Sequence, residues 1–373
     1  MNITTTPDDL FIGIMSGTSL DGIDVVIARF GNTVESIARE SFPFDKNIRD
    51  MLHTFATASS VKLDEFVRMH FSLAALYADA VSHTLERAKR SPTDIRAIGM
   101  HGQTVRHLPS AHATFQLGSG SALAARTGID VVSDFRSGDV AIGGQGAPLV
   151  PMFDAIFLRD EHQDRVTLNI GGIANITILP ARKKSGEIIA YDTGPGNMLI
   201  DELAHRYFAK AFDEDGGIAR SGVVNEALVR EMLSHPYFSS PEPKSTGREL
   251  FGQEFLTRFI DLVDSGYLKE NDAVATATDL TARSIAHSLQ TERAEVITSG
   301  GGAKNAFLME RLTVLLPNCK ITTSDELGIP SQAKEAIAFA YFAKAYLDQT
   351  YIHLPRTTGA DWSLILGSLS RGK

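Results

Sequence analysis

The chain has 373 residues, and at roughly 150 residues per domain this length predicts two domains. Hydrophobic residues make up 43% and charged residues 22%, which is typical of a globular protein and excludes long disorder, collagen and a coiled-coil rod. The 45 acidic and 36 basic side chains leave a formal charge of -9, whereas proteins that neutralise many phosphates carry a basic excess. The composition therefore disfavours a nucleic-acid partner.

A single cysteine, Cys319, excludes an intramolecular disulfide and a cluster of thiolate metal ligands. No run of apolar residues approaches the ~18 needed to cross a membrane, and the N-terminus lacks a basic segment followed by an apolar one. We therefore expect a cytoplasmic protein with no membrane partner.

Apolar, β-branched runs alternate along the chain with longer segments of helical periodicity, which favours an α/β fold. In chain order, the predicted strands are 10–15, 23–30, 95–100, 129–135, 165–171, 174–179 and 294–300. The predicted helices are 63–89, 121–127, 197–210, 223–234, 249–264, 272–290, 305–316 and 333–348.

The pattern contains a rough duplication. Residues 10–30 form a strand, a glycine-containing turn and a second strand, and the same arrangement returns at 165–179. Two halves that each open on a glycine hairpin suggest two lobes that face a cleft. We expect an N-terminal lobe over 1–155, a C-terminal lobe over 156–344, and a tail from about 345 to 373 that packs back on the first lobe.

The turn of the first hairpin, residues 13–22 (GIMSGTSLDG), has the composition of an anion-binding loop. Gly17 and Gly22 permit close approach of the backbone, neighbouring serine and threonine residues add hydroxyls, and Asp21 adds a carboxylate. The Walker A pattern is absent, and a strand rather than a helix follows the glycines, which excludes a P-loop and a Rossmann fingerprint. The alternative is an ordinary hairpin loop rich in turn-forming residues.

Two glycine motifs occur in the second half. Residues 169–175 (NIGGIAN) form the turn of the second hairpin, where a glycine pair signals a tight turn that is structural in most proteins. Residues 299–305 (SGGGAKN) lie between a strand and a helix. Three successive glycines there cost conformational entropy, so a ligand that lies on bare backbone explains them better than folding does.

Asp192 begins the segment 192–197 (DTGPGN), which follows a strand and opens a helix. A carboxylate at the carboxyl end of a strand is well placed in a cleft, and Gly194 and Gly196 leave space for a substrate. The alternative role of Asp192 is a helix N-cap. Residues 244–249 (KSTGRE) place two cations and two hydroxyls before a helix, and a capping segment is the alternative there too.

A polar set lies between the two hairpins, in residues 101–104 (HGQT), 134–139 (DFRSGD) and 143–148 (GGQGAP). The first two segments directly follow predicted strands, at the end where α/β clefts open. They supply the side chains that hydrogen-bond sugar hydroxyls and bind a carboxylate. For His101 alone, a buried structural histidine is the alternative.

Together these motifs resemble the anhydro-N-acetylmuramic acid kinase family, which belongs to the superfamily of sugar kinases, Hsp70 and actin. The matching segments are MSGTSLDGIDV, GMHGQTVRH, DFRSGDVAIGGQGAPLVP, NIGGIANIT, YDTGPGNMLID, PKSTGRELF and SGGGAKN, with EAIAFAYFA at 335–343. The resemblance implies a two-lobed sugar kinase/Hsp70/actin-like fold with an ATP cleft between the lobes. It also implies that ATP phosphorylates O6 of 1,6-anhydro-N-acetylmuramic acid while water opens the anhydro ring, in recycling of the cell wall.

The resemblance also assigns roles to the motifs. Asp192 is expected to be the catalytic base, and Asp21 is expected to contact Mg²⁺. The residues expected to bind ATP are Gly17, Thr18, Ser19, Leu20, Asp21, Gly22, Ile23, Asp24, Asn169, Gly171, Gly172, Gly300, Gly301, Gly302 and Asn305. The residues expected to hold the sugar are His101, Gln103, Thr104, Asp134, Arg136 and Glu335. Arg136 suits the lactyl carboxylate, because its guanidinium binds carboxylates bidentately.

The expected partners are the two small substrates and a second copy of the chain in a homodimer. Two other classes stay open, namely a kinase of the same superfamily that acts on another sugar or acid, and a non-catalytic ATP-dependent sensor or chaperone-like module. A chaperone-like module is disfavoured because no residues remain for a peptide-binding domain. A sensor is disfavoured because neither the expected base nor the expected phosphate loops are altered.

Overall fold

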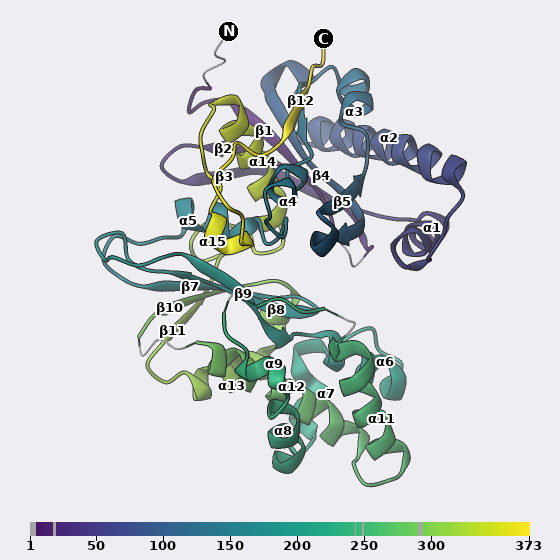
Figure 1. Cartoon of the computed structure of the whole chain (residues 1–373), viewed down its shortest axis with the longest axis vertical. Coiled ribbons are helices and arrows are strands. Elements are labelled where there is room, and N and C mark those ends of the chain that lie inside the picture. The colour runs from purple at the N-terminus through teal and green to yellow at the C-terminus, as the bar shows by residue number, and fades with distance from the viewer. Residues whose placement is uncertain (1–4, 18–19, 243, 248–249, 290–292) are drawn as a thin grey trace. The chain divides into compact units, whose positions relative to one another are not determined.

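The chain folds into two compact α/β units, which a computed structural model describes over residues 5–17, 20–242, 244–247, 250–289 and 293–373 (Figure 1). The first unit comprises Met1–Phe157 and Gly328–Lys373, and the second comprises Leu158–Leu327. Each unit is built on one mixed sheet. The prediction of an α/β protein with two lobes is therefore confirmed.

The first unit contains a seven-stranded sheet and the helices that cover it. Its strands are β1 (Leu10–Ser16), β2 (Gly22–Phe30), β3 (Val34–Pro43), β4 (Ile95–Leu108), β5 (Ala113–Leu117), β6 (Val131–Ser133) and β12 (Ser368–Ser370). Its α-helices are α1 (Lys46–Thr57), α2 (Leu63–Arg87), α3 (Gly120–Thr127), α4 (Ser137–Ala141), α5 (Val150–Phe157), α14 (Lys334–Leu347) and α15 (Pro355–Thr358).

The strands of this sheet follow the order β12-β6-β4-β1-β2-β3, and β5 pairs with β4. β1, β2 and β3 are antiparallel neighbours, whereas β4 runs parallel to both β1 and β6. Alternate residues of β1, such as Ile12 and Ile14, are buried in a core that also contains Leu73 and Tyr77 of α2. This core lies on the α2 face of the sheet.

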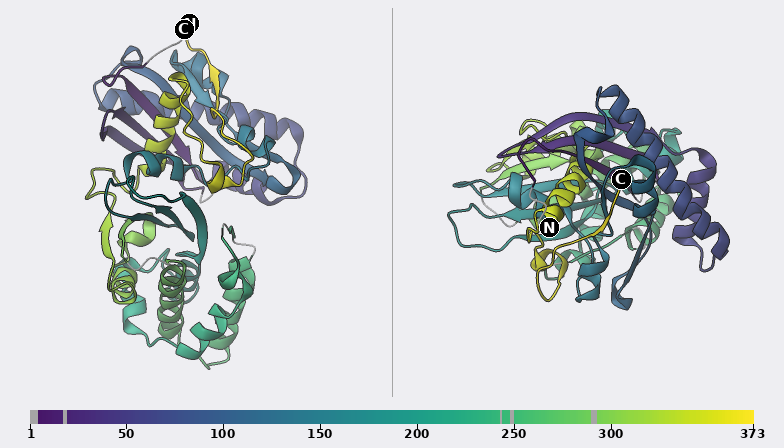
Figure 2. Two further views of the ribbon diagram at one scale, coloured as in Figure 1. Left: turned by 60° about the vertical axis from the view of Figure 1, so that its left-hand side comes forward. Right: turned by 90° about the horizontal axis from the view of Figure 1, so that it is seen from above.

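Helix α14 lies directly on the strands of the first unit (Figures 1 and 2). A Cβ atom at Gly13 would lie 1.7 Å from the carbonyl oxygen of Ala336, and one at Gly99 would lie 1.9 Å from that of Phe339. Only glycine permits so close an approach of helix and strand backbones. Because of this packing, the chain returns to the first unit at Gly328, and α14 lies outside the second lobe in which the predicted boundaries placed it.

The second unit contains a five-stranded sheet. Its strands are β7 (Arg165–Ile170), β8 (Ile173–Leu179), β9 (Ile189–Pro195), β10 (Glu295–Ser299) and β11 (Lys320–Thr323). Its α-helices are α6 (Met198–Phe208), α7 (Gly217–Ser221), α8 (Glu226–Leu233), α9 (Pro236–Ser239), α11 (Leu256–Asp264), α12 (Glu270–Ser288) and α13 (Ala306–Leu315), and a π-helical turn (Phe251–Phe255) precedes α11.

The order of this second sheet, β9-β8-β7-β10-β11, repeats the order β3-β2-β1-β4-β6 of the first. In both sheets the first three strands in chain order are antiparallel neighbours, and the remaining two continue parallel to the first strand. The duplication read from the two hairpins thus extends through five strands of each unit.

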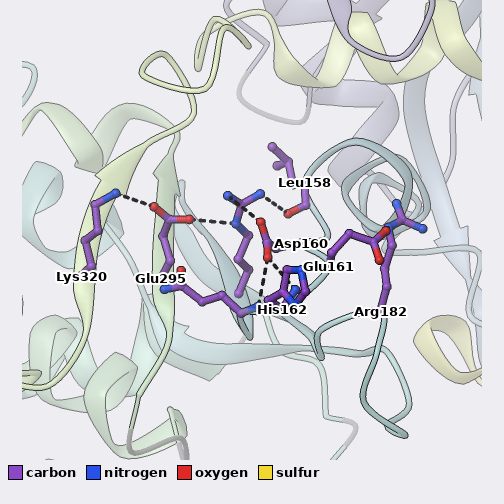
Figure 3. Close-up of polar contacts among 9 residues, drawn as sticks. Leu158, Asp160, Glu161, His162, Arg182, Glu295 and Lys320 are labelled. Atoms are coloured by element: carbon purple, nitrogen blue, oxygen red, sulfur yellow. Dashed lines mark hydrogen bonds and ion pairs between the residues drawn. The ribbon is translucent and has the colours of Figure 1, made fainter.

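Charged residues gather where the parallel strands of the second sheet begin (Figure 3). Glu295 of β10 accepts hydrogen bonds from Arg165 Nε of β7 at 2.8 Å and from Lys320 Nζ of β11 at 2.7 Å. Although burial opposes the shift, these cations lower the pKa of Glu295. The cluster holds three strands in register at the amino-terminal end of the sheet, where we assign it a structural role.

Each predicted strand and helix overlaps an observed element, although residues 249 and 290 lie outside the described residues. Several observed elements were not predicted, among them helix α1, strand β5 and the edge strand β3. Strand β3 illustrates the reason. Its residues alternate between half-buried and exposed positions and include Glu35, Arg39 and Glu40, so no apolar run marks the strand.

Candidate active site

The tip of the first hairpin and the first turn of α14 line one pocket of about 450 Å³ in the first unit. Its lining residues are Met15, Gly17, Asp21, Gly22, Ile23, Asp24, Ser41, Phe42, Pro43, Gln332 and Glu335. Most of the predicted phosphate loop is therefore brought together with Glu335, a predicted sugar ligand. Thr18 and Ser19 lie outside the described residues, and the Leu20 side chain is buried in the core.

Carboxyl groups dominate this pocket. Burial raises the pKa of Glu335, while Lys334 and Arg136 oppose the shift. Burial also raises the pKa of Asp24, although Ser41 Oγ donates a hydrogen bond to its carboxylate at 2.5 Å. The negative charge of these carboxylates repels a bare anion, so phosphate oxygens need a cation between them and the carboxylates.

The carboxylates of Asp21 and Asp24 offer the oxygen ligands that Mg²⁺ prefers, beside the predicted phosphate loop. Within the described part of the chain, no group of three or more His, Cys, Asp and Glu residues is arranged to hold a metal. Mg²⁺ characteristically uses one or two carboxylates together with substrate phosphates and water. The residues present therefore fit a Mg²⁺ ion that arrives with a phosphorylated ligand.

His101 and Arg136 form a hydrogen-bonded pair in the first unit. Arg136 Nε and Nη2 lie 3.0 and 2.7 Å from His101 Nε2, and His101 Nδ1 lies 3.3 Å from the Ser16 carbonyl oxygen. The ring therefore donates at Nδ1 and accepts at Nε2. Burial, reinforced by Arg136, lowers the pKa of His101 to about 3, so the imidazole is neutral. Both ring nitrogens are used to orient Arg136 and the end of β1.

A second buried network fixes Arg136 from its other side. Arg136 Nη1 donates to the Gly146 carbonyl at 2.6 Å, and the Gly146 N–H donates to Asp139 at 2.5 Å. Asp139 also accepts from His353 Nε2 at 2.5 Å and from Thr358 Oγ1 at 2.6 Å. Although burial opposes the shift, these donors lower the pKa of Asp139. The GGQGAP loop is thus tied to the C-terminal segment.

Two further predicted sugar ligands, Gln103 and Thr104, contact neighbouring strands and loops. Gln103 Nε2 donates to the Gly17 carbonyl at 3.0 Å, and its Oε1 is buried with no hydrogen-bond partner among the described residues. Thr104 Oγ1 accepts from Gln116 of β5 at 3.4 Å. Gln103 therefore orients the predicted phosphate loop. Asp134 is exposed and lines a different pocket from that of Glu335.

In the second unit, the glycine motifs meet at the carboxyl ends of β7, β9 and β10. The N–H groups of Gly196 and Asn197 donate to the carbonyls of Gly172 and Gly171, both at 2.8 Å. A Cβ atom at Gly302 would lie 2.3 Å from Ile170 Cγ2. The turns of NIGGIAN, DTGPGN and SGGGAKN therefore form one backbone-rich surface.

Two asparagines hold this surface in shape. Gly300 has a φ of 83°, and a Cβ there would lie 2.7 Å from Asn169 Oδ1. Asn305 Oδ1 accepts from the Leu308 N–H at 3.0 Å and caps α13. The Asn305 side chain therefore acts as a helix cap. The backbone at Gly301 is more open, because a Cβ atom there would lie no closer than 3.6 Å to another atom, Asn197 Nδ2.

Asp192, on β9, is held by a segment that the sequence analysis left without a role. The Asp192 N–H donates to the Lys244 carbonyl at 3.0 Å, and the Thr246 N–H donates to Asp192 Oδ2 at 2.9 Å. Tyr237 Oη donates to the Asp192 carbonyl at 2.7 Å. Lys244 Nζ in turn donates to the Tyr237 and Phe238 carbonyls at 3.0 and 3.1 Å, which links Lys244 to the segment that carries Tyr237.

We call Tyr237, Lys244 and Thr246 the clasp around Asp192. The KSTGRE pattern signalled only a polar segment before a helix, because its contact with a strand more than fifty residues away leaves no local trace in the sequence. Arg248 and Glu249 of this pattern lie outside the described residues. The clasp fixes one oxygen of the Asp192 carboxylate.

Two α/β units with one strand order, each opened by a glycine-tipped hairpin, define a protein of the sugar kinase, Hsp70 and actin class. The chain belongs to the anhydro-N-acetylmuramic acid kinase family, whose model matches residues 9–372.

Curated relatives match nearly the whole chain. An anhydro-N-acetylmuramic acid kinase of Shewanella denitrificans is 43% identical over 96% of this chain and 97% of its own. One of Shewanella sediminis is 43% identical over 96% of this chain and 98% of its own. Among solved structures, the activator of 2-hydroxyisocaproyl-CoA dehydratase from Clostridium difficile, with bound ADPNP, matches with a TM-score of 0.47 at 13% identity, over 91% of this chain and 96% of that one.

None of the helices within the described residues combines the length and the apolar character that crossing a membrane requires.

Proposed function

We propose that this chain uses ATP to phosphorylate O6 of 1,6-anhydro-N-acetylmuramic acid while water opens the anhydro ring, yielding N-acetylmuramic acid 6-phosphate in recycling of the cell wall. Membership of the kinase family over residues 9–372 carries this proposal. Asp192, a carboxylate at the glycine-lined surface of the second unit, supports it, because the clasp presents this carboxylate in one orientation.

We assign the base to Asp192. Thr246 donates to Oδ2 of its carboxylate, which holds this side chain in one orientation to take a proton from the attacking water. As C1–O6 breaks, the electron pair stays on O6, which then attacks the γ-phosphoryl group. Phosphoryl transfer asks mainly for positioning and charge stabilisation.

We assign nucleotide binding to the two hairpins and the triple glycine. The loop from Gly17 to Asp24 and the turn of Asn169, Gly171 and Gly172 would hold the phosphates. Gly300, Gly301 and Gly302 would bound the adenosine, with Asn305 as the cap that shapes this turn. When bound with ATP beside Asp21, Mg²⁺ supplies the positive charge that the carboxylate pocket lacks.

We assign sugar binding to Arg136 and Glu335, with the remaining predicted residues acting through them. Arg136 would bind the lactyl carboxylate, and Glu335 would accept from a sugar hydroxyl or share its proton with one. His101 orients Arg136, and Gln103 and Thr104 orient the loop and strand beside it. Asp134 lines a different pocket from Glu335, so we do not assign Asp134 to the sugar substrate of the kinase reaction.

The experiment is a coupled assay with purified chain, ATP, Mg²⁺ and the anhydro sugar. We expect one ADP per sugar consumed and a product with the mass of N-acetylmuramic acid 6-phosphate. Omitting Mg²⁺ should stop the reaction. Turnover of another sugar with the anhydro sugar left untouched would overturn the substrate, and nucleotide binding without any turnover would favour a sensor.

We further propose that the chain acts as a homodimer in the cytoplasm, where ATP is available. On α2, Leu63, Val67 and Phe71 are exposed at 72%, 48% and 54% and follow a spacing of four residues, which places them on one helix face. Such an apolar stripe supports association. Light scattering coupled to size exclusion should give twice the mass of the chain, and a charged Val67→Glu variant should give the monomer.

A further inference from the structure

A second pocket in the first unit, about 330 Å³ in volume, lies on the α2 face of the sheet. Met100 lines it and belongs to the core shared with α2. His101 also lines it, and the centroid of its ring lies 4.8 Å from that of Phe339 on α14. None of the described residues lines both this pocket and the carboxylate pocket beside α14, although His101 and Asp134 of this pocket were predicted to bind the same sugar as Glu335.

The pocket presents several hydrogen-bonding groups that no described residue satisfies. Ser133, Ser137 and Ser368 have hydroxyls without a partner in the described part of the chain, and so has the carboxylate of Asp134. Gln116 uses its Nε2 within the fold, which leaves its Oε1 as an acceptor. Donors and acceptors are thus mixed, as hydroxyl groups of a ligand require.

The one charged side chain among the lining residues of the pocket disfavours anions. Asp134 is the one formal charge among its lining residues, and no lysine or arginine lines it. His70 Nδ1 accepts a hydrogen bond from the Gly118 N–H at 3.1 Å, and burial lowers the pKa of His70. The imidazole is therefore neutral and offers an Nε2–H donor. The carboxylate of Asp134 would repel a phosphate or carboxylate group.

One wall of the pocket is aromatic. Phe115 is 41% exposed, and its ring centroid lies 5.9 Å from that of His70, so the two rings continue one surface. A flat apolar wall opposite hydroxyls and a carboxylate is suited to a pyranose, whose face carries C–H groups and whose rim carries hydroxyls. The volume also lies at the lower end of the range for small-ligand pockets, which is roughly 300–1,000 Å³.

We propose that this pocket binds an uncharged pyranose, with Asp134 accepting from its hydroxyls and Phe115 packing on its face. Asp134 has a φ of 59°, a left-handed conformation that is unusual for a residue with a side chain. Such conformations are retained at binding sites when the surrounding structure enforces them. This pocket is a site beyond the proposed kinase reaction, whose acidic sugar it would repel.

Asparagine tolerates the same conformation, so Asp134→Asn removes the charge without straining the backbone. Asp215, in the second unit, is also exposed and has a φ of 53°, so Asp215→Asn is the matched control. The test uses saturation-transfer NMR and calorimetry with N-acetylglucosamine as the uncharged probe. Glucosamine and N-acetylglucosamine 6-phosphate carry the same ring with a positive and a negative charge.

We expect N-acetylglucosamine to bind in the millimolar range, the 6-phosphate to bind at least tenfold more weakly, and Asp134→Asn to lower affinity about tenfold while Asp215→Asn leaves it unchanged. Phe115→Leu should also weaken binding. No binding by the parent chain, equal binding by Asp134→Asn, or tighter binding of the 6-phosphate would overturn the proposal. Because the readout is binding, its failure leaves the kinase proposal standing, and loss of kinase activity leaves this proposal standing.

Discussion

The two units share a strand order but differ in the chemistry that they place at their loops. In the first unit, the hairpin loop and α14 bring carboxyl groups together, at Asp21, Asp24 and Glu335. In the second unit, the corresponding surface consists of glycine backbone and asparagine amides, with Asp192 as its carboxylate. A duplicated framework thus supplies equivalent loop positions, and the residues that follow each strand decide what those loops bind.

The comparison implies a division of labour. A carboxylate-rich pocket binds phosphate only together with a cation, whereas backbone N–H groups bind phosphate directly by donating hydrogen bonds to it. The units also use glycine differently. In the first unit it admits a helix onto the sheet, and in the second it shapes the turns at the strand ends.

The largest expected effect tests the carboxylate of the second unit. Asp192→Asn should lower kcat about 10²–10⁴-fold while leaving ATP affinity nearly unchanged, because it removes the base but little volume. Steady-state kinetics and calorimetry with an ATP analogue measure the two quantities. Glu202→Gln, an exposed residue on the following helix, is the control and should retain full turnover. Turnover of Asp192→Asn within threefold of the parent would move the base elsewhere.

The next effect tests the use of glycine in the first unit. Gly13→Ala and Gly99→Ala should each destabilise the chain by about 3 kcal/mol or more, because the added Cβ meets the backbone of α14. Gly31→Ala, with no atom within 4 Å of its Cβ, should change stability little. Urea unfolding followed by circular dichroism measures this difference, and equal stability of all three variants would refute the helix-on-strand packing.

Acidification should affect the two units in different pH ranges. The folded pKa of His101, about 3, lies below its ordinary value of 6.5, so the unfolded chain takes up this proton first. Stability should therefore be full above pH 6.5 and fall by about 2 kcal/mol between pH 6.5 and 5. Glu295 in the second unit has a lowered pKa, so its contribution is present above 4.5 and is lost only at lower pH.

Chemical unfolding at a series of pH values measures this dependence, with hydrogen exchange in β4 and β10 to separate the units. In His101→Gln, the loss between pH 6.5 and 5 should shrink by about 2 kcal/mol, with a remainder from His70 and His107, whose pKa values burial also lowers, while the loss below 4.5 should persist. An unchanged profile in this variant would show that His101 is not the group that titrates.

The smallest effect concerns the clasp. Tyr237→Phe removes the hydroxyl that donates to the Asp192 carbonyl, and we expect a loss of about 1 kcal/mol in stability and a fall of a few-fold in kcat with KM unchanged. Tyr267→Phe, at a tyrosine that is 77% exposed in the same unit, should behave as the parent. A change in KM alone would place Tyr237 in substrate binding instead.

The sequence was most informative where glycine and strand patterns are local. The two hairpins, the three glycine turns and the buried helices α2 and α14 all leave periodic or compositional signals. The pairing of α14 with Gly13 joins residues more than three hundred positions apart, and no local pattern reports it. The same holds for the clasp and for the separation of Asp134 from Glu335, because both depend on contacts between residues far apart in the chain.

The family resemblance supplied what neither composition nor geometry could, namely the anhydro sugar itself. Its O6 is locked in an ether and cannot accept phosphate until C1–O6 breaks, so ring opening and phosphoryl transfer must belong to one turnover. Free N-acetylmuramic acid, whose O6 is not delivered by ring opening, should accordingly be a poor substrate.

The most direct test runs the reaction in ¹⁸O-labelled water and locates the label by mass spectrometry. The account predicts one ¹⁸O at C1 of N-acetylmuramic acid 6-phosphate and none in the transferred phosphate, because water attacks the sugar and O6 attacks ATP. Label in phosphate with the anhydro ring intact would mean simple hydrolysis of ATP, and would contradict the coupled reaction.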